Sequence, residues 1–170
     1  MQIQAGIYKG RRVKTVRNAP YRPTTSLVRK SLFDILGNLS GYHVLDLFAG
    51  SGIIGFEAAS RGAESVTFVD SSMRVTSLLK MNGSFFTQTK INYFRMDALK
   101  FLDSCETYDL ILADPPYRYP DTTMVIETGI NRLNEGMFLI LESSPREYPI
   151  SPARVKLYGD TQLTFWKKEK

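Results

Sequence analysis

The stretch Val44-Leu45-Asp46-Leu47-Phe48-Ala49-Gly50-Ser51-Gly52 indicates the fold of this chain. Its first five residues are apolar except for Asp46, which is typical of a buried parallel strand. The glycines that follow permit a tight turn into the N-terminus of a helix, and with Gly55 they satisfy a G-x-G-x-x-G pattern. A strand, a glycine turn and a helix in this order predict an α/β fold that holds a ligand close to the turn.

Strand and helix patterns alternate through the rest of the chain. We expect strands at 44–48, 65–69, 91–94, 109–113 and 137–141, with helices at 52–61, from about 72, at 98–102 and at 122–133. A closing pair of strands is expected at 154–157 and 161–166, on either side of Gly159-Asp160. This alternation predicts a doubly wound sheet with a late antiparallel element.

Acidic residues stand at the ends of three expected strands. Asp46 lies at the end of the first, Asp70 ends the second, and Asp97 follows the third. Because ligands of open α/β sheets bind at the carboxyl ends of the strands, we expect these carboxylates around one crevice. Asp70 stands where an acid binds ribose hydroxyls. Asp97, helped by the N–H of Ala98, could accept from an adenine amino group, cap the following helix, or do both.

Two cofactors fit this pattern. A nicotinamide dinucleotide would use the same glycine turn and the same acid, so an NAD(P)-dependent oxidoreductase is one alternative. Asp46 argues against a nicotinamide dinucleotide, because a carboxylate is unfavourable beside a pyrophosphate. It is favourable beside the ammonium group of S-adenosylmethionine, which carries no phosphate. We therefore favour S-adenosylmethionine. The residues expected to bind it are Asp46, Phe48, Ala49, Gly50, Ser51, Gly52, Asp70, Ser71, Asp97, Ala98 and Asp114.

The expected catalytic residues are Asp114-Pro115-Pro116-Tyr117, directly after the apolar run 110–113. Two consecutive prolines cannot continue a ladder, so the chain turns at the C-terminal end of this strand. The turn offers a carboxylate, a proline carbonyl and an aromatic face, which suit a flat base with an exocyclic amino group. Asp114 and the Pro115 carbonyl would accept the two amino hydrogens, and Tyr117 would stack on the base. Adenine and guanine fit these four residues equally well.

Positive charge is concentrated at the N-terminus. The net charge is +5, but residues 1–30 contain eight basic side chains and no acidic one, whereas the remaining residues contain 14 basic and 17 acidic side chains. Such an asymmetry predicts a polyanionic partner. The residues expected to contact it are Lys9, Arg11, Arg12, Lys14, Arg22 and Arg29.

The same N-terminal segment is expected to be folded. Alternating stretches at 3–7 and 12–16 predict a small β-hairpin, and a turn follows at 18–23. Thr24, Thr25 or Ser26 would cap a helix that ends near Leu36 and Gly37. Its apolar residues recur at helical spacing, which leaves Arg29 and Lys30 on the other side. We expect a single domain, 1–170, in which this extension (1–37) precedes the cofactor-binding and catalytic core (42–170).

Three groups of residues together resemble a known family. They are the glycine loop from Asp46 to Gly52, the Asp114–Tyr117 turn, and the N-terminal set Gly6-Ile7-Tyr8-Lys9-Gly10-Arg11-Arg12, Arg22-Pro23-Thr24, Val28-Arg29 and Leu32-Phe33. In this combination, nearly the whole chain resembles the bacterial 16S ribosomal RNA guanine-N2 methyltransferases, which modify guanine 966 of the small-subunit RNA. Many amino-methyltransferases share the glycine loop and the turn, so the basic segment is the more discriminating group.

The resemblance implies a Rossmann-like class I methyltransferase fold, with a mostly parallel seven-stranded sheet, a late antiparallel strand and an N-terminal hairpin and helix. It also implies methyl transfer from S-adenosylmethionine to a guanine of 16S RNA, either free or within a small-subunit particle. An adenine-N6 methyltransferase on RNA or DNA is the alternative within the same chemistry, and a non-catalytic ribosome-assembly factor is the alternative outside it. The chain departs from the family at Ser26, Leu27 and Lys30, where members commonly carry an acidic residue, a basic residue and Glu.

The remaining features fit a cytoplasmic protein. Cys105 is the only cysteine, so no internal disulfide is possible. The sequence has no apolar run of the length of a membrane span and no signal peptide at its N-terminus. We expect a monomer without a metal ion, and a structural role for His43, the only histidine.

Overall fold

The computed structural model describes residues 1–15 and 25–170. Several sequence predictions fall on residues 16–24 and therefore lie outside the described part: the end of the expected hairpin, the turn at 18–23, the alternative cap Thr24, and the expected RNA contact Arg22.

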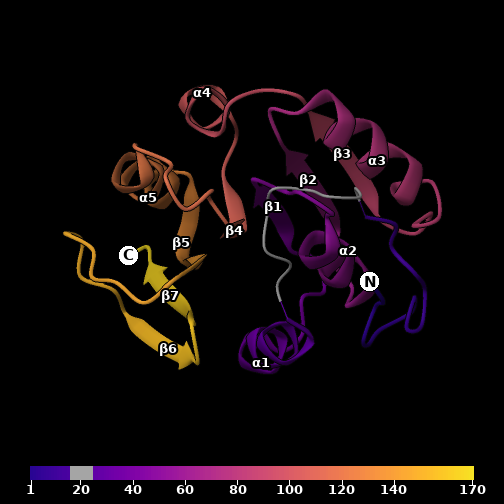
Figure 1. Ribbon diagram of the computed structural model, residues 1–170, viewed down its shortest axis with the longest axis horizontal. Coiled ribbons are helices and arrows are strands. Elements are labelled where there is room, and N and C mark those ends of the chain that lie inside the picture. Colours follow the sequence, from indigo (N-terminus) through magenta and orange to yellow (C-terminus); the bar gives the residue numbers. More distant parts are fainter. Residues whose placement is uncertain (16–24) are drawn as a thin grey trace.

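A seven-stranded sheet forms the centre of the molecule, in the order β3-β2-β1-β4-β5-β7-β6 (Figure 1). Five strands are parallel: β1 (His43–Leu47), β2 (Ser65–Val69), β3 (Lys90–Phe94), β4 (Tyr108–Ala113) and β5 (Leu133–Ser143). β7 (Thr161–Lys167) lies antiparallel between β5 and β6 (Arg154–Tyr158). The predicted doubly wound sheet with its late antiparallel element is confirmed.

Helices cover both faces of this sheet (Figure 1). On one face, α1 (Ser26–Leu36), α2 (Ile53–Ser60) and α3 (Met73–Gly83) bury a cluster that includes Phe33, Phe56 and Phe68. On the other, α4 (Ala98–Ser104) and α5 (Thr122–Asn131) pack over Leu102, Val125 and Trp166. Residues of opposite parity on each strand therefore enter two separate cores.

The α5–β5 boundary differs from the prediction. The helix ends at Asn131 instead of 133, and β5 begins at Leu133 instead of 137. Leu133 is fully buried and pairs with Tyr108 of β4, next to a register shift between Tyr108 and Leu110. Pairing with β4 on both sides of this register shift makes β5 longer than expected. Its first residue, Leu133, also fits the apolar spacing of the preceding helix, which is why the helix was predicted to end there.

The expected N-terminal hairpin is only partly present. Its two arms meet at one antiparallel bridge, Gln2–Arg12, and the segment 4–10 forms a wide loop instead of a tight turn. The backbone N–H of Ile7 donates to the carbonyl of Ser60 in α2 at 2.8 Å, which removes it from any hairpin ladder. Gly6 has φ +83°, and a Cβ there would lie 1.8 Å from the same carbonyl oxygen, so only glycine permits this close approach.

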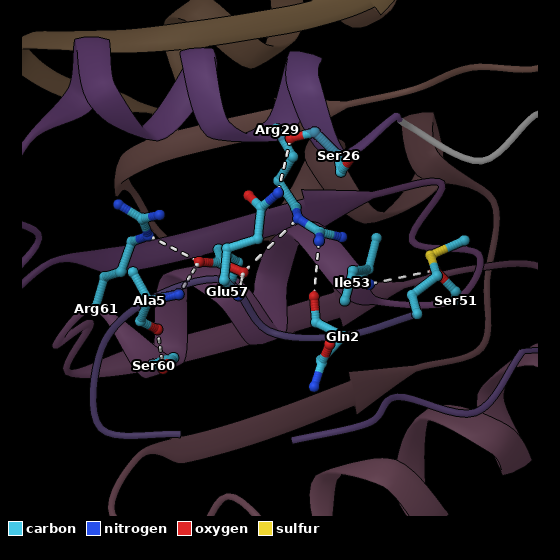
Figure 2. Close-up of polar contacts among 11 residues, drawn as sticks. Gln2, Ala5, Ser26, Arg29, Ser51, Ile53, Glu57, Ser60 and Arg61 are labelled. Carbon is cyan, nitrogen blue, oxygen red and sulfur yellow. Dashed lines mark hydrogen bonds and ion pairs between the residues drawn. The ribbon is translucent and has the colours of Figure 1, made fainter. Parts of the chain in front are cut away.

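Glu57 of α2 fastens this extension to the sheet domain (Figure 2). Its carboxylate is fully buried and accepts the backbone N–H groups of Gln4 at 2.8 Å and Ala5 at 3.0 Å. It also accepts from Nε of Arg61 at 3.0 Å and lies 3.7 Å from Nε of Arg29. Two cations and two backbone donors thus compensate a charge that burial alone would make very costly.

Arg29 is therefore not where the sequence predicted. The side chain is 4% exposed, and its Nη2 donates to the carbonyl of Gln2 at 2.7 Å. Thr25 caps α1, which turns Val28, Arg29 and Leu32 inward and leaves Leu27 65% exposed. The prediction that Arg29 lies on the exposed side of the helix is wrong, because the buried carboxylate of Glu57 draws it inward. A side chain buried in this way offers little surface to RNA.

Candidate functional site

The glycine loop between β1 and α2 has a backbone that few residues tolerate. Phe48 is the one non-glycine residue with a positive φ (+58°) in the described chain, and Gly50 and Gly52 have φ values of +53° and +74°. A Cβ at Gly52 would lie 2.4 Å from Leu79 and 2.8 Å from Phe56. Strain of this kind is typical of loops that hold a ligand close to the backbone.

Asp70 lies directly against this loop. Its Oδ2 accepts the backbone N–H of Gly50 at 3.1 Å, and its Oδ1 accepts that of Ser72 at 2.9 Å. Ser72 in turn caps α3, and the neighbouring Ser71 is exposed. The loop and the acid that the sequence assigned to one ligand are thus joined at the carboxyl ends of β1 and β2.

Asp46 is buried beneath the loop. Its Oδ2 accepts the backbone N–H of Gly55 at 3.0 Å, and burial raises the pKa of this carboxyl well above its ordinary value. A Cβ at position 55 would lie 2.8 Å from this oxygen and 2.3 Å from the Phe68 ring. The third glycine of the G-x-G-x-x-G pattern therefore makes room for Asp46. Ser51 is also buried, and its hydroxyl accepts from the N–H of Ile53 (Figure 2).

Asp97 caps α4 as expected, accepting from the N–H groups of Leu99 at 3.0 Å and Lys100 at 3.2 Å. Its second oxygen accepts from the hydroxyl of Tyr119 at 3.2 Å. Burial, and then Asp97, raises the pKa of Tyr119 to about 12. The Tyr119 ring also packs edge-on against Phe48, with centroids 4.9 Å apart. The sequence reading missed Tyr119, which joins the loop after β4 to the glycine loop and to Asp97.

The Asp114–Tyr117 turn leaves β4 at the same edge of the sheet. The N–H of Asp114 lies 3.5 Å from the carbonyl of Leu47, at the end of β1, and the carbonyl of Pro116 accepts from the N–H of Tyr119 at 2.8 Å. These contacts place the turn next to the glycine loop, as parallel pairing of β1 and β4 requires.

A small cavity lies under this turn, on the face covered by α1 and α2. Its lining includes Asp46, Asp114 and Glu142, which carry the carboxylates, and the apolar residues Leu32, Ile54, Leu112, Ala113, Ile140 and Leu163. Asp114 as a whole residue is exposed. The protein packed around its carboxyl, and then the charge of Glu142, raise its pKa to about 8. The sequence reading missed Glu142, which follows the expected fifth strand.

Tyr117 is 75% exposed beside this cavity. The guanidinium of Arg146 lies 5.3 Å from its ring centroid, within reach of a cation–π contact. Two hydrogen bonds join Arg146 to Gln162 of β7. The backbone N–H of Arg146 donates to Oε1 of Gln162 at 3.1 Å, and Nε2 of Gln162 donates to the backbone carbonyl of Arg146 at 2.8 Å. Arg146 was not predicted, because its position depends on this contact with β7.

The other residues that were expected to contact RNA differ in their exposure to solvent. Lys9, Arg11, Arg12 and Lys14 are exposed, whereas Arg29 is buried. The Arg11 guanidinium lies 5.6 Å from the Tyr8 ring and 5.4 Å from the Phe85 ring, and Phe85 is 53% exposed. A larger hollow lies beside the N-terminal segment, and its lining contains none of the carboxylates described above. We therefore place the candidate active site at the carboxyl ends of the strands.

Residues 1–15 and 25–170 contain neither a candidate metal site nor a helix that could span a membrane. No group of three or more His, Cys, Asp or Glu side chains there is arranged to hold a metal ion. Within the same ranges, no helix has both the length and the apolar character needed to cross a membrane.

The strand order, the antiparallel β7 inserted beside β5, and the carboxylates around the glycine loop define a Rossmann-like class I methyltransferase fold. Solved structures share it. The Thermus thermophilus hypothetical protein TTHA0928 superimposes with a TM-score of 0.85 at 27% identity, over 98% of this chain and 99% of that one. The Escherichia coli protein yhhF superimposes with a TM-score of 0.87 at 24% identity, over 100% and 98%.

Sequence comparison shows the family. The chain belongs to the family described as "Conserved hypothetical protein 95", which matches residues 1–167. The ribosomal RNA small subunit methyltransferase D of Haemophilus influenzae is 33% identical over 70% of this chain and 65% of its own length. The Escherichia coli protein of the same name is 27% identical over 99% and 90%.

Proposed function

We propose that this protein transfers a methyl group from S-adenosylmethionine to the exocyclic N2 amine of a guanine in small-subunit ribosomal RNA, at position 966 by family resemblance. The observation that carries the proposal is the meeting of Asp46, Asp70 and Asp114 around one strained glycine loop. The names of the relatives support RNA as the substrate. We further propose that the protein acts in the cytoplasm as a monomer and a single domain.

The cofactor would lie along the glycine loop. S-adenosylmethionine, when bound, supplies a methyl group activated by its positively charged sulfur. The loop from Phe48 to Gly52 would give it close backbone contact, Asp70 with Ser71 would bind the ribose, and Asp97 with Ala98 would bind the adenine. Asp46 is already bonded to Gly55, so we assign it the task of holding the loop. Burial favours its neutral form, and the positively charged donor, when bound, would favour the ionised form that attracts it.

The turn at Asp114 would orient the acceptor. The lone pair of a guanine N2 is delocalised into the ring, which makes it a poor nucleophile. Asp114 and the Pro115 carbonyl would accept its two hydrogens, favour a pyramidal nitrogen and aim the lone pair at the methyl carbon. Orientation of this kind contributes up to about 7–11 kcal/mol in favourable cases. Tyr117, which is 75% exposed, would stack on the extruded base and contribute about 1–3 kcal/mol.

Asp114 is also suited to receive the proton. After methyl transfer the nitrogen carries a positive charge and must lose one hydrogen. A carboxyl group whose pKa is about 8 accepts that proton more readily than an ordinary aspartate would. Release to water would complete the cycle, so no separate strong base is required.

Two measurements test this function. Calorimetry with S-adenosylmethionine and with NAD separates a methyltransferase from an oxidoreductase, and we expect heat only with the former. Tritiated methyl transfer should then label unmodified small-subunit particles or naked 16S RNA, and mapping should place the label on one guanine. No heat with S-adenosylmethionine at high protein concentration would contradict the proposal, and so would label on an adenine.

A further inference from the structure

Glu142 and Asp114 lie side by side at the carboxyl edge of the sheet. In the parallel pairing of β4 and β5, Leu112 stands opposite Ile140 and Ala113 opposite Leu141. Continuing this register by one residue beyond the end of β4 brings Asp114 opposite Glu142, and the charge of Glu142 does act on Asp114. Paired strands lie about 4.8 Å apart, and side chains at matching positions leave the same face. Both residues line the small cavity, together with apolar residues of α1, α2 and β7.

The Asp114 turn cannot select between the two amino-bearing purines. Asp114 and the Pro115 carbonyl would accept amino hydrogens from adenine N6 or guanine N2 equally well. The two bases differ at the neighbouring ring nitrogen. Guanine N1 carries a hydrogen and donates, whereas adenine N1 has a lone pair and accepts. A second acceptor placed beside Asp114 would therefore distinguish them.

Within the function proposed above, we propose that Glu142 accepts the N1–H of the target guanine while Asp114 accepts from its N2 amine. An ionised carboxylate only accepts hydrogen bonds and has about four positions for them, so Glu142 can take this N–H alongside its other contacts. Adenine would direct the lone pair of N1 at the same carboxylate, which leaves both groups without a donor. The Asp114–Glu142 pair is thus the element of the site that selects guanine.

The cavity fits the edge of a base. Its volume, about 30 Å³, exceeds the roughly 10–15 Å³ that a cavity measured in this way needs to hold one water molecule. It can admit an amino group or an N–H edge, but not a whole purine ring. The ring would remain outside, beside the exposed Tyr117, which is the arrangement that stacking requires. The apolar residues of its lining lower the local dielectric, and this strengthens hydrogen bonds to the two carboxylates.

The test compares two target bases in one RNA. In a small-subunit RNA fragment, the target guanine is replaced by 2-aminopurine, which keeps the 2-amino group but has an unprotonated N1. The wild-type protein should favour guanine by about 10–100-fold in kcat/KM, the range expected for one charged hydrogen bond. Glu142→Gln should reduce this preference several-fold, because a side-chain amide can rotate to donate to N1. Glu147→Gln makes the same charge change at an exposed neighbour and should leave the preference unchanged.

The possible outcomes separate this inference from the function on which it rests. Equal rates on the two RNAs with the wild-type protein would overturn the role of Glu142 and leave guanine-N2 methylation standing. An unchanged preference in Glu142→Gln that still binds S-adenosylmethionine would do the same. Methyl transfer to neither RNA would overturn both proposals. The wild-type comparison needs no variant, so it decides the matter even if Glu142→Gln does not fold.

Discussion

Among single residues, Asp114 has the clearest consequence for pH dependence. Its pKa is raised to about 8 by the surrounding protein and by Glu142, and the proposed role needs the carboxylate form. The single-turnover rate of methyl transfer should therefore rise with pH and level off above about pH 8. Glu142→Gln removes a neighbouring negative charge, so the midpoint should move to lower pH. Rates measured from pH 6 to 10 would show this, and an identical midpoint in both proteins would contradict the coupling.

The same residue should lower the stability of the fold. A carboxyl whose folded pKa lies above its unfolded value of about 3.9 stabilises the protein fully only below that value. This contribution is lost as the pH rises through the folded value, about 8. Asp114→Asn should thus raise the melting temperature at pH 8 and retain cofactor binding, whereas Asp114→Ala, which removes the hydrogen-bond acceptor, should abolish methyl transfer. A scan at pH 4 is the control, since the wild-type and Asp114→Asn proteins should converge there. An active Asp114→Ala protein would refute the catalytic role.

At the scale of elements, the joint between α1, α2 and the N-terminal extension depends on Glu57. Arg29→Ala would leave this buried carboxylate with less compensation, so we expect a loss of about 3–5 kcal/mol in the free energy of unfolding. Lys30→Ala is the matched control, because Lys30 is the next residue of α1 and its 2.6 Å contact with Asp34 is exposed. We expect that change to cost about 0.3–0.5 kcal/mol. Urea unfolding would measure both, and similar values would show that the Glu57 contacts are not important.

Local patterns predicted the elements well wherever local packing decides them. The strands β1 to β4, the start of α3 near Ser72 and the caps Thr25 and Asp97 follow from runs and spacings of a few residues. The placement of Arg29 was predicted wrongly, and the hairpin only partly correctly, because their partners, Glu57 and Ser60, lie some 28 to 53 residues away in sequence. Glu142 joins the site through the pairing of β5 with β4, and Arg146 through its hydrogen bonds to Gln162 of β7. No short motif signals either contact.

At the scale of the whole molecule, exposed basic residues of this protein, whose net charge is +5, lie on two separate surfaces. The four exposed cations of the extension are Lys9, Arg11, Arg12 and Lys14. They belong to the N-terminal segment, which runs beside α2 and α3 (Figure 1), and the N–H of Lys14 donates to Asn82 of α3. The far edge of the sheet, formed by β6, carries its own cations, Arg154 and Lys156, and Lys167 lies on the adjacent β7. A protein that docked RNA by charge alone would use both surfaces, whereas a site-specific enzyme should favour one.

Replacing Arg11, Arg12 and Lys14 together with Gln tests which surface binds RNA. Each phosphate contact contributes close to one unit to the slope of log affinity against log salt concentration, so the slope should fall by about two to three units. Affinity at low salt should fall with it, and cofactor binding should not change, because these residues lie outside the glycine loop. The control replaces Arg154, Lys156 and Lys167, the same number of exposed cations at the other edge. Equal losses of RNA affinity in the two triple variants would mean that charge alone binds the RNA. An unchanged salt slope in the first variant would mean that Arg11, Arg12 and Lys14 do not contact RNA phosphates.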